Sequence, residues 1–575
     1  MNLFLDYQKK ILLFIKKLEK KKILVVPKNL NNIKIELPPK NLEADISCNV
    51  AMLLTKSNNK SPMEIAEILK KNFSISFKEF KNINIAKPGF INISFHEFFW
   101  KKYLTRLLLL NTKYGSNLKS KKKYNIEFVS ANPTGPLHVG HCRGAIIGDT
   151  LSNLLLFNGN KVTKEYYVND YGEQIKNFVA SVYYRILELT EKKPFPLDKN
   201  LYPGNYIIDI AKKIIKNSSI KNFKDFDKIN KKLTSESIKY SMQIIKDNLN
   251  LLGVKHNNFI FESKLINNNT IEKAIENLKK KNYIYKGKLE APKGEDIVNW
   301  KIRDQLLFKS TSFGDDSDRP LQKANGEWTY FAGDIAYHSN KVSRKFDVLI
   351  NILGADHSGY IKRIESATKA LSNKNVDLIC KVSQLVKLFK NGEPFKMSKR
   401  KGDYITVYDL VNEVGRDSTR FMMLNRSNDA ELDFDFKKVT DKSKENPVFY
   451  VQYAYARINS VFRLLKINLN KKIKLDKGKF FLNYHEMEIL KKISEWPRCI
   501  EISTNKLEPH RIPFYLYELV TLFHSYWNLG KDNREYRFIP KNGKINLARL
   551  NLLQALSIVI KNGMSILGVS TPNKM

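Results

Sequence analysis

The chain is 575 residues long and 42% hydrophobic, which is enough for roughly two to four globular domains. Its 99 Lys and Arg against 58 Asp and Glu give a formal net charge of +41, which favours a nucleic acid as partner, although a solvated basic surface produced by AT-rich coding is the alternative. The four cysteines are scattered, without a Cys-x-x-Cys pair or a His at ligand spacing, which argues against a protein-bound zinc ion or a disulfide framework and fits the cytoplasm.

The first unit is predicted over residues 1–112 and combines helix and strand. A basic amphipathic helix spans Asp6 to Glu19, and these two acidic residues and the lack of Arg favour an ordinary first helix over a transit peptide. Pro38-Pro39 breaks the chain, Pro88-Gly89 forms a turn, and residues 90–95 alternate as a strand does. No apolar run approaches the roughly 18–20 residues that span a membrane, so we expect no membrane association.

An α/β unit is predicted over residues 113–440, because strands and helices alternate as in a Rossmann-type domain with a mostly parallel sheet. A helix-rich segment at about 183–302 is interpreted as an insertion that separates two half-sheets. From residue 441 the pattern is helical, which predicts an all-α domain over 441–575. The predicted strands are Ile126–Ser130, Val162–Val168, Thr329–Phe331 and Val348–Leu353.

The most specific string is Ala-Asn-Pro-Thr-Gly-Pro-Leu-His-Val-Gly-His, residues 131–141, between a predicted strand and a predicted helix from Leu137 to Phe157. This layout directs backbone N–H groups and the positive end of a helix dipole at one point, where an anion binds well. A helix N-terminus disfavours protonation, so His138 and His141 are expected to donate to phosphate oxygens as neutral imidazoles. As a metal pair they would need a third ligand, and none is visible nearby.

Three glycines recur every fourth residue along the predicted helix, at Gly140, Gly144 and Gly148. Close packing of the helix on the sheet explains this spacing in part. A face without side chains also lets a nucleotide approach the backbone, and we expect both roles.

The second string is Lys-Met-Ser-Lys-Arg, residues 396–400, with an Asn-Gly-Glu-Pro turn before it and Lys-Gly-Asp after it. A basic pentapeptide is usually a solvated loop. Phosphoryl chemistry, however, needs positive charge where negative charge develops, and Lys396 and Lys399 on a hinged loop suit that task. Ser398 adds a hydroxyl donor.

Together the two strings resemble the ATP-binding signatures of class I aminoacyl-tRNA synthetases, with Arg400 departing from the final serine of the family pattern. Further blocks resemble the arginyl-tRNA synthetase family in particular. These blocks are Lys123 through Arg143, Thr311 to Asp316, Trp328 through Tyr337, Gly354 to His357, and Asn446 through Arg457.

The resemblance implies ATP-dependent ligation of L-arginine to tRNA(Arg) through an arginyl-adenylate, with Mg²⁺ accompanying the nucleotide. It implies that Glu127, Ser130, Asn132, Tyr330 and Asp334 bind arginine, and carboxylates suit a guanidinium in fork geometry. Catalysis is assigned to His138, His141, Lys396 and Lys399. Ala355 replaces a glutamine that some family members have. The predicted ATP-binding residues are Pro133, Thr134, Gly135, Leu137, His138, Gly140, His141, Asp356, His357, Met397 and Ser398.

The helical tail resembles the anticodon-binding domain of the family, and the first unit resembles its N-terminal domain, which touches the corner of tRNA. Gln452, Tyr453, Tyr455 and Arg457 are the predicted tRNA contacts, with a core role for the tyrosines as the alternative. A monomer in the cytoplasm is expected. Two rivals remain: another class I synthetase, which would carry thiol ligands or a long editing insertion, and a non-catalytic RNA-binding relative, which would have lost a signature residue.

Overall fold

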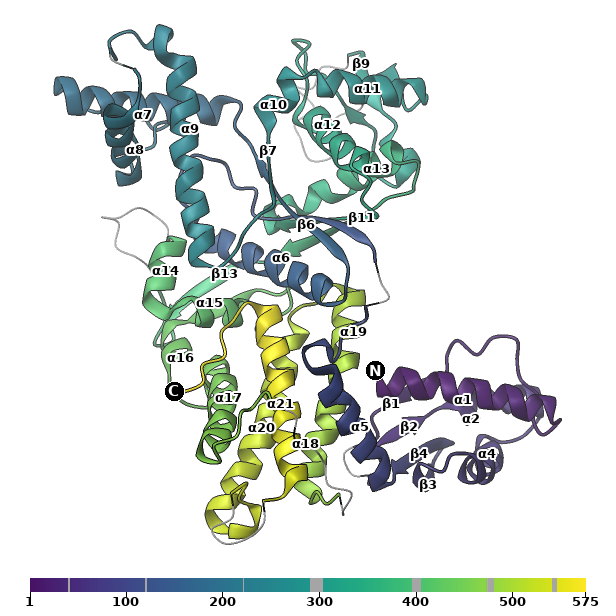
Figure 1. The fold of residues 1–575 in the computed structure, drawn as a ribbon. Coiled ribbons are helices and arrows are strands. Elements are labelled where there is room, and N and C mark those ends of the chain that lie inside the picture. The colour runs from purple at the N-terminus through teal and green to yellow at the C-terminus, as the bar shows by residue number, and fades with distance from the viewer. Residues whose placement is uncertain are drawn as a thin grey trace.

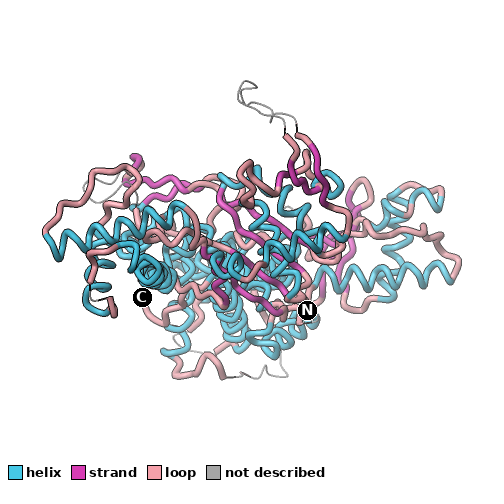
Figure 2. The backbone as a smooth tube through the Cα atoms, turned by 90° about the horizontal axis from the view of Figure 1, so that it is seen from above, coloured by secondary structure: helices cyan, strands magenta, loops and turns pink. Residues whose placement is uncertain are grey.

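The computed structural model describes residues 1–39, 42–118, 121–220, 222–289, 303–395, 405–471, 473, 480–539 and 545–575. Figure 1 shows a central sheet above a helical bundle, with the N-terminal unit at the side of that bundle. Seen from above, strands cross the middle of the molecule and helices lie on either side of them (Figure 2).

The N-terminal unit is a four-stranded antiparallel sheet in the order β1-β2-β4-β3, with helices packed on it. The predicted first helix and the strand at residues 90–95 are both present. Ser61 caps the start of α4 with a capping box: its side chain accepts from Glu64 N, and the Glu64 side chain accepts from Ser61 N. This helix is therefore stabilised locally. The elements are α1 (Leu3–Lys20), β1 (Ile35–Glu36), β2 (Ile46–Cys48), α2 (Val50–Leu53), α3 (Thr55–Asn58), α4 (Pro62–Ser76), β3 (Phe80–Ala86) and β4 (Phe90–Phe95), followed by α5 (Glu97–Leu110).

The central sheet has five strands in the order β12-β11-β5-β6-β7, and all four neighbouring pairs are parallel. This agrees with the predicted parallel α/β domain. The order reverses between β5 and β11, since the chain runs from β5 to β7 on one side and from β11 to β12 on the other. The elements are β5 (Lys123–Glu127), α6 (Val139–Phe157), β6 (Lys161–Val168), β7 (Asn258–Phe261), β11 (Val348–Gly354), α13 (Ile361–Leu371) and β12 (Asp377–Ser383).

The predicted insertion at about 183–302 is not a single helical block. Three helices do follow β6, but β7 then returns to the edge of the main sheet beside β6. This strand was not predicted from the sequence because the strand has only four residues and lies within a Lys- and Asn-rich stretch. The helices are α7 (Glu173–Glu191), α8 (Asn205–Asn217) and α9 (Phe226–Leu251).

A second unit with its own hydrophobic cluster follows β7, between the two halves of the sheet. Residues 329–331, predicted as a strand, begin α12 instead, because the Thr329 side chain accepts a hydrogen bond from Ala332 N and so caps a helix. The elements are α10 (Glu262–Asn267), α11 (Thr270–Lys280), β8 (Ile284–Gly287), β9 (Gln305–Phe308), β10 (Arg319–Pro320) and α12 (Tyr330–Ser343).

A small mixed sheet in the order β14-β13-β15 leads to the C-terminal helices. Helix α21 is long and apolar enough to span a membrane by length and composition, so the expectation that no segment approaches that length is wrong; 83% of its apolar window is buried in the protein core. The elements are β13 (Val386–Lys390), β14 (Glu393–Pro394), α14 (Val407–Val414), α15 (Arg416–Met423), β15 (Leu432–Asp435), α16 (Phe436–Thr440), α17 (Pro447–Leu464), α18 (Tyr484–Ser494), α19 (Trp496–Lys506), α20 (Arg511–Asp532) and α21 (Leu547–Leu567).

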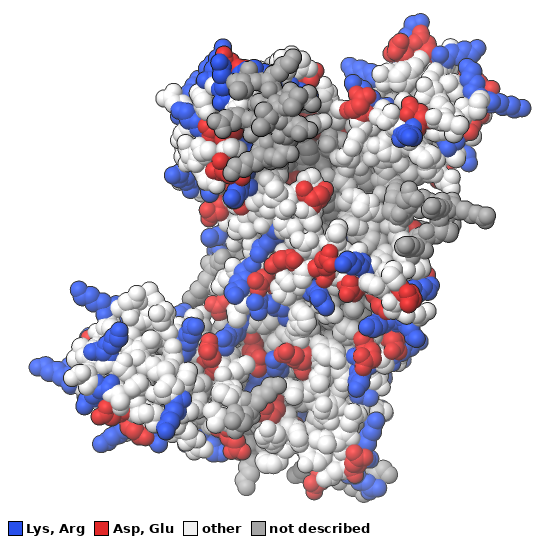
Figure 3. Space-filling model, turned by 180° about the vertical axis from the view of Figure 1, so that it is seen from behind, with Lys and Arg blue, Asp and Glu red and all other residues white. Residues whose placement is uncertain are grey.

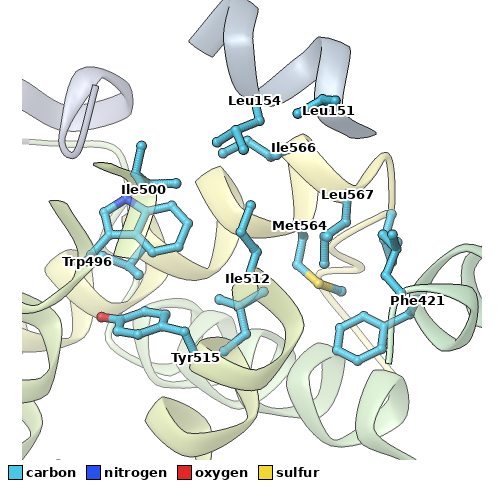
Figure 4. Packing of buried hydrophobic residues seen from close by; sticks show 14 of the residues in the cluster. Leu151, Leu154, Phe421, Trp496, Ile500, Ile512, Tyr515, Met564, Ile566 and Leu567 are labelled. Atoms are coloured by element: carbon cyan, nitrogen blue, oxygen red, sulfur yellow. The ribbon is translucent and has the colours of Figure 1, made fainter. Parts of the chain in front are cut away.

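One hydrophobic core runs without a break from α6 into the helical bundle. Figure 4 shows residues of α6 facing the end of α21, with side chains of α15, α19 and α20 around them. The helix that follows the predicted anion-binding turn is therefore packed directly on the C-terminal helices. The labelled side chains are Leu151, Leu154, Phe421, Trp496, Ile500, Ile512, Tyr515, Met564, Ile566 and Leu567.

A buried ion pair reinforces the same junction. Arg420 is fully buried, its Nη2 lies 2.5 Å from Asp149 Oδ2, and it also donates to the carbonyls of Leu252 (2.7 Å) and Leu567 (2.8 Å). These contacts join the ends of α9 and α21 to α6. Lys164 Nζ, 2.6 Å from Asp149 Oδ1, completes the network.

Replacing Arg420 by methionine is expected to lower the free energy of unfolding by about 3–5 kcal/mol, because a buried carboxylate loses its main partner. Urea denaturation of the full chain measures this loss. Arg416, on the same helix but with its side chain 48% exposed, is the matched control, and Arg416→Met should cost less than about 1 kcal/mol. Equal losses for the two variants would contradict a stabilising role of the buried pair.

Candidate active site

The carboxyl ends of β5 and β11 lie where the strand order reverses, and parallel α/β sheets bind ligands at such a point. The predicted signature turn follows β5, and Asp356 and His357 follow β11. Burial lowers the pKa of His141, and the charge of Asp356 opposes part of this shift, so the ends of the two strands lie within electrostatic range of each other. The fold thus brings together residues that are more than 200 positions apart in the chain.

The chain leaves β5 through a strained backbone. Val129 has φ +72° and Ser130 has φ +43°, in the left-handed region that β-branched residues rarely adopt. Ser130 Oγ donates to Glu127 Oε1 at 3.0 Å and accepts from Tyr167 N at 3.1 Å, and the Tyr166 hydroxyl donates to Ala131 O at 2.8 Å. Such strain persists only where neighbours hold it, and it is typical of functional sites.

The two signature histidines form the cap of α6, which begins at Val139, two residues later than the predicted start at Leu137, so His138 is the N-cap residue and not part of the first turn. Gly140 N donates to His138 Nδ1 at 3.1 Å, and His138 N donates to His141 Nδ1 at 3.3 Å. Because each Nδ1 accepts a hydrogen bond, each neutral ring carries its proton on Nε2. The rings lie 3.9 Å apart between centroids.

Both imidazoles are neutral at physiological pH. Burial lowers the pKa of His138, and burial together with the neighbouring His138 lowers the pKa of His141 to about 4. Their Nε2–H groups are therefore donors that need no protonation, as the sequence predicted. Donors fixed by backbone hydrogen bonds suit a phosphate oxygen better than a mobile cation would.

The turn before the cap is partly buried. Pro133 and Leu137 are buried, Leu137 N donates to Asn248 Oδ1 at 2.9 Å, and Leu137 O accepts from Val407 N at 2.9 Å. The side chain of Leu137 and both its backbone groups are thus engaged within the protein, while its contact with ATP stays a prediction. Gly140 is exposed at the helix entrance, as a ligand-facing position requires.

Of the three glycines on one face of α6, Gly148 allows the helix to pack closely on the sheet. A Cβ on Gly148 would lie 2.3 Å from the Phe128 ring, so close packing excludes a side chain there. A Cβ on Gly144 would meet only Ile352, at 4.0 Å. The packing explanation thus applies to Gly148.

Lys396, Met397, Ser398 and Lys399 lie outside the described residues, but the chain on both sides is described. Phe395 N donates to Leu388 O at 2.8 Å, which fixes the end of the β13–β14 hairpin directly before the pentapeptide. On the other side, Val139 N donates to Ile405 O at 3.0 Å, and Thr406 forms a bridge with His138. The chain that leaves the basic pentapeptide therefore pairs with the cap of α6.

The carboxylates predicted to bind arginine differ in their pairing. Glu127 Oε2 lies 2.5 Å from Lys341 Nζ, and this lysine is fully buried and also donates to Asn351 Oδ1 at 2.9 Å. Asp334, on the first turns of α12, accepts from the Tyr360 hydroxyl at 2.7 Å. Asn132 Nδ2 donates to Gln174 Oε1 at 2.6 Å, and Tyr330 is 79% exposed.

A second acidic side chain, Glu262, interacts electrostatically with Asp334, and the sequence did not predict it. Burial raises the pKa of Asp334 to about 6, with Glu127 adding to the shift. Burial, together with the charges of Asp334 and Asp170, raises the pKa of Glu262 to about 7. These carboxyls titrate near neutrality because they share a desolvated site, and a bound cation would favour their ionised forms.

Three family models match the chain over nearly its whole length. They are the arginyl tRNA synthetase N terminal domain over residues 6–95, the catalytic domain of tRNA synthetases class I (R) over 103–461, and the DALR anticodon binding domain over 451–575. An arginine–tRNA ligase from Pelagibacter ubique is 55% identical over 577 residues and covers 100% of both chains. The chain belongs to the arginyl-tRNA synthetase family.

It is thus an enzyme of the class I aminoacyl-tRNA synthetases. An arginine–tRNA ligase from Rhizobium etli is 42% identical over 592 residues, again with 100% of both chains covered. The solved arginyl-tRNA synthetase of Thermus thermophilus covers 94% of this chain and 96% of its own, with a TM-score of 0.69 at 17% identity, and it shares the fold. The predicted family, fold class and enzyme class are confirmed.

The predicted tRNA contacts on α17 of this synthetase are not equivalent. Tyr455 is only 6% exposed and packs in the core, which favours the core role that was the alternative to an RNA contact. Gln452 Nε2 donates to Asp417 Oδ2 at 3.0 Å and Ser570 O at 3.1 Å, which ties α17 to the end of the chain. Tyr453 and Arg457 are half-buried, with the guanidinium carbon of Arg457 4.2 Å from the Tyr453 ring centroid.

The basic charge is spread rather than gathered on the face of the synthetase seen in Figure 3, where Lys and Arg side chains lie among Asp and Glu. On that face, the pattern fits a solvated basic surface as the explanation of the chain's net charge of +41. Among the described residues no grouping of His, Cys, Asp and Glu is suited to a metal ion.

Sequence reasoning missed three residues that interact with the carboxylates predicted to bind arginine. Lys341, Tyr360 and Glu262 come from α12, the segment after β11, and α10, and no local motif marks them. Glu262 has one weak signal, since it directly follows β7, as Glu127 ends β5. That signal is usable only once β7 is recognised as a strand of the sheet.

Proposed function

We propose that this synthetase ligates L-arginine to tRNA(Arg) in two steps at the carboxyl ends of β5 and β11. The arginine carboxylate attacks the α-phosphorus of ATP, which releases pyrophosphate and forms arginyl-adenylate. The 2′-hydroxyl of the terminal tRNA ribose then attacks the carbonyl carbon and releases AMP. Mg²⁺ arrives with the nucleotide.

The observation that carries this proposal is a pairing between the first signature and the chain that follows the second. Ile405 and Thr406, five and six residues after Arg400, pair with the cap of α6, where His138 and His141 present Nε2–H donors. Phosphoryl transfer needs positioning and charge neutralisation more than acid–base chemistry, and these groups supply both. Lys396 and Lys399 are proposed to neutralise charge on the departing pyrophosphate, with Ser398 and Met397 beside the nucleotide.

Arginine is proposed to lie beside the nucleotide with its guanidinium among the carboxylates. Asp334 and Glu262 supply charge, because Glu127 is already paired with Lys341. Ser130 and Asn132 receive the α-amino end, and Tyr330 covers the side chain. Thr134, Gly135 and Gly140 would approach the phosphates, with Asp356 and His357 at the adenosine.

The remaining assignments concern tRNA and the state of the protein. We assign residues 1–112 to the corner of tRNA, 113–440 to catalysis and 441–575 to the anticodon, with Tyr453 and Arg457 as contacts. The protein is proposed to act as a cytoplasmic monomer without a membrane partner.

Exchange of pyrophosphate into ATP, measured with the full chain, tests the function. Exchange should require L-arginine and be absent with L-citrulline, which has the same shape but no charge, because buried carboxylates demand a cation. Running the assay with and without tRNA(Arg) shows whether activation needs the RNA. Exchange with another amino acid, or none under any condition, would contradict the proposal.

A further inference from the structure

The three helices inserted between β6 and β7 each send one side chain to the signature turn. Gln174 of α7 accepts from Asn132 Nδ2 at 2.6 Å, and Asn248 of α9 accepts from Leu137 N at 2.9 Å. Between them, the hydroxyl of Tyr206 on α8 donates to Thr134 O at 2.9 Å. The turn is therefore held from outside, at three successive points, by an element that is separate from the sheet.

Of the three residues, Tyr206 packs with its ring directly against the turn. A Cβ on Gly135 would lie 3.1 Å from the ring Cζ and 3.1 Å from the hydroxyl oxygen, so the tyrosine covers the glycine of the turn closely. A Cβ on Gly204 would lie 2.5 Å from the same ring, on the side of the helix start. The two glycines let the ring sit between α8 and the turn, with its hydroxyl at the Thr134 carbonyl.

The turn needs such support because its own backbone is unfavourable. Val129 and Ser130 adopt positive φ angles directly before it, and such conformations persist only when their surroundings impose them. On its far side the turn is held through Leu137 and Val139 by the chain that leaves the basic pentapeptide. Tyr206 fixes the carbonyl that lies between these two constraints.

We propose that Tyr206 is a positioning residue for the ATP-binding turn, which deepens the proposed function and rests on it. Its hydroxyl holds the Thr134 carbonyl away from the phosphates. The neighbouring N–H groups of the turn therefore already point toward the phosphate site before ATP binds. Preorganisation of this kind acts on nucleotide binding and on the transition state, and it does not involve the arginine pocket.

The test is Tyr206→Phe in the full chain, which keeps the ring over Gly135 and removes only the hydroxyl. We expect kcat/KM for ATP in arginine-dependent pyrophosphate exchange to fall by about 10-fold, since small misplacements of a reacting geometry are costly. The KM for arginine should stay within about twofold and the thermal midpoint unchanged, which separates positioning from a general loss of structure.

Tyr183→Phe is the matched control, because the Tyr183 hydroxyl also donates to a backbone carbonyl, that of Lys224 at 3.4 Å, but within the insertion. This variant should exchange like the wild type. A Tyr206→Phe enzyme with wild-type kcat/KM for ATP would overturn the inference, and so would equal losses in both variants. A wild-type protein that fails to exchange would instead overturn the proposed function, so the two failures are distinguishable.

Discussion

Replacing Asp334 by asparagine is expected to raise the KM for arginine by about 100-fold or more, because a buried charge-assisted pair is worth roughly 2–5 kcal/mol when one partner is removed. The side chain is isosteric, so Tyr360 can still donate to it. Glu127 does not compensate for the loss, since Lys341 already neutralises it. Steady-state pyrophosphate exchange as a function of arginine concentration measures the change.

The same site predicts a dependence on pH. The pKa of Asp334 is raised to about 6 and that of Glu262 to about 7, so each carboxyl holds its proton at a higher pH than usual. A guanidinium binds the ionised carboxylates. At a pH below these pKa values, each carboxyl must therefore lose its proton before arginine can bind. Therefore kcat/KM for arginine should be nearly constant above about pH 8, fall by up to about tenfold per pH unit between about pH 7 and pH 6, and fall by about 100-fold per pH unit below about pH 6, where both carboxyls are protonated.

Asp334→Asn should lose part of this acidic limb, because one of the two titrating groups is gone. Asp347→Asn is the control: its carboxylate accepts from Lys123 N at the opposite end of the sheet, and its KM for arginine should stay within about twofold. A variant at position 334 with wild-type KM and an unchanged pH profile would remove Asp334 from the arginine site.

Replacing Lys399 by alanine should slow adenylate formation by about 10²–10³-fold, because the transition state loses a positive charge where pyrophosphate departs. The fold should be intact and the KM for arginine nearly unchanged, since the loop would act in the transition state. Rapid-quench measurement of adenylate formation in a single turnover, with a thermal midpoint for each protein, makes the comparison.

Lys390→Ala provides a matched loss of charge on the adjoining hairpin, where Lys390 Nζ lies 3.1 Å from Glu413 Oε1 on the surface. This variant is expected to form adenylate at the wild-type rate. Should Lys399→Ala do the same, the pentapeptide would have no part in catalysis, whatever its resemblance to a signature.

The elements with a strong local pattern were predictable from the sequence. Strand β6, strand β11 and the helix after the signature turn have runs of apolar residues or firm stop signals, and the structure has them within a few residues of the predicted bounds. Strand β7 was missed because four residues carry little pattern. The start of α12 was misassigned because the β-branched and aromatic residues at 329–331 favour a strand, while a threonine cap decides for a helix.

The candidate site was predictable only where a motif runs continuously along the chain. His138 and His141 belong to one turn, and the helix N-terminus predicted their neutral state, although in the structure burial is the main cause. Tertiary folding brings Lys341 and Glu262 to the carboxylates that we propose to bind arginine, from elements whose own sequences give no sign of it. Tyr455 shows that the sequence could not separate a predicted RNA contact from a core position, because its burial depends on the packing of the helices around α17.

The central claim is that ATP is held at the cap of α6 beside the carboxylates of Asp334 and Glu262. A crystal structure of the full chain with a non-hydrolysable sulfamoyl analogue of arginyl-adenylate tests it directly. We expect the sulfamoyl oxygens within hydrogen-bonding distance of His138 Nε2 or His141 Nε2, and the guanidinium at Asp334. An analogue bound elsewhere, or in the opposite orientation with adenine against Asp334, would contradict the account.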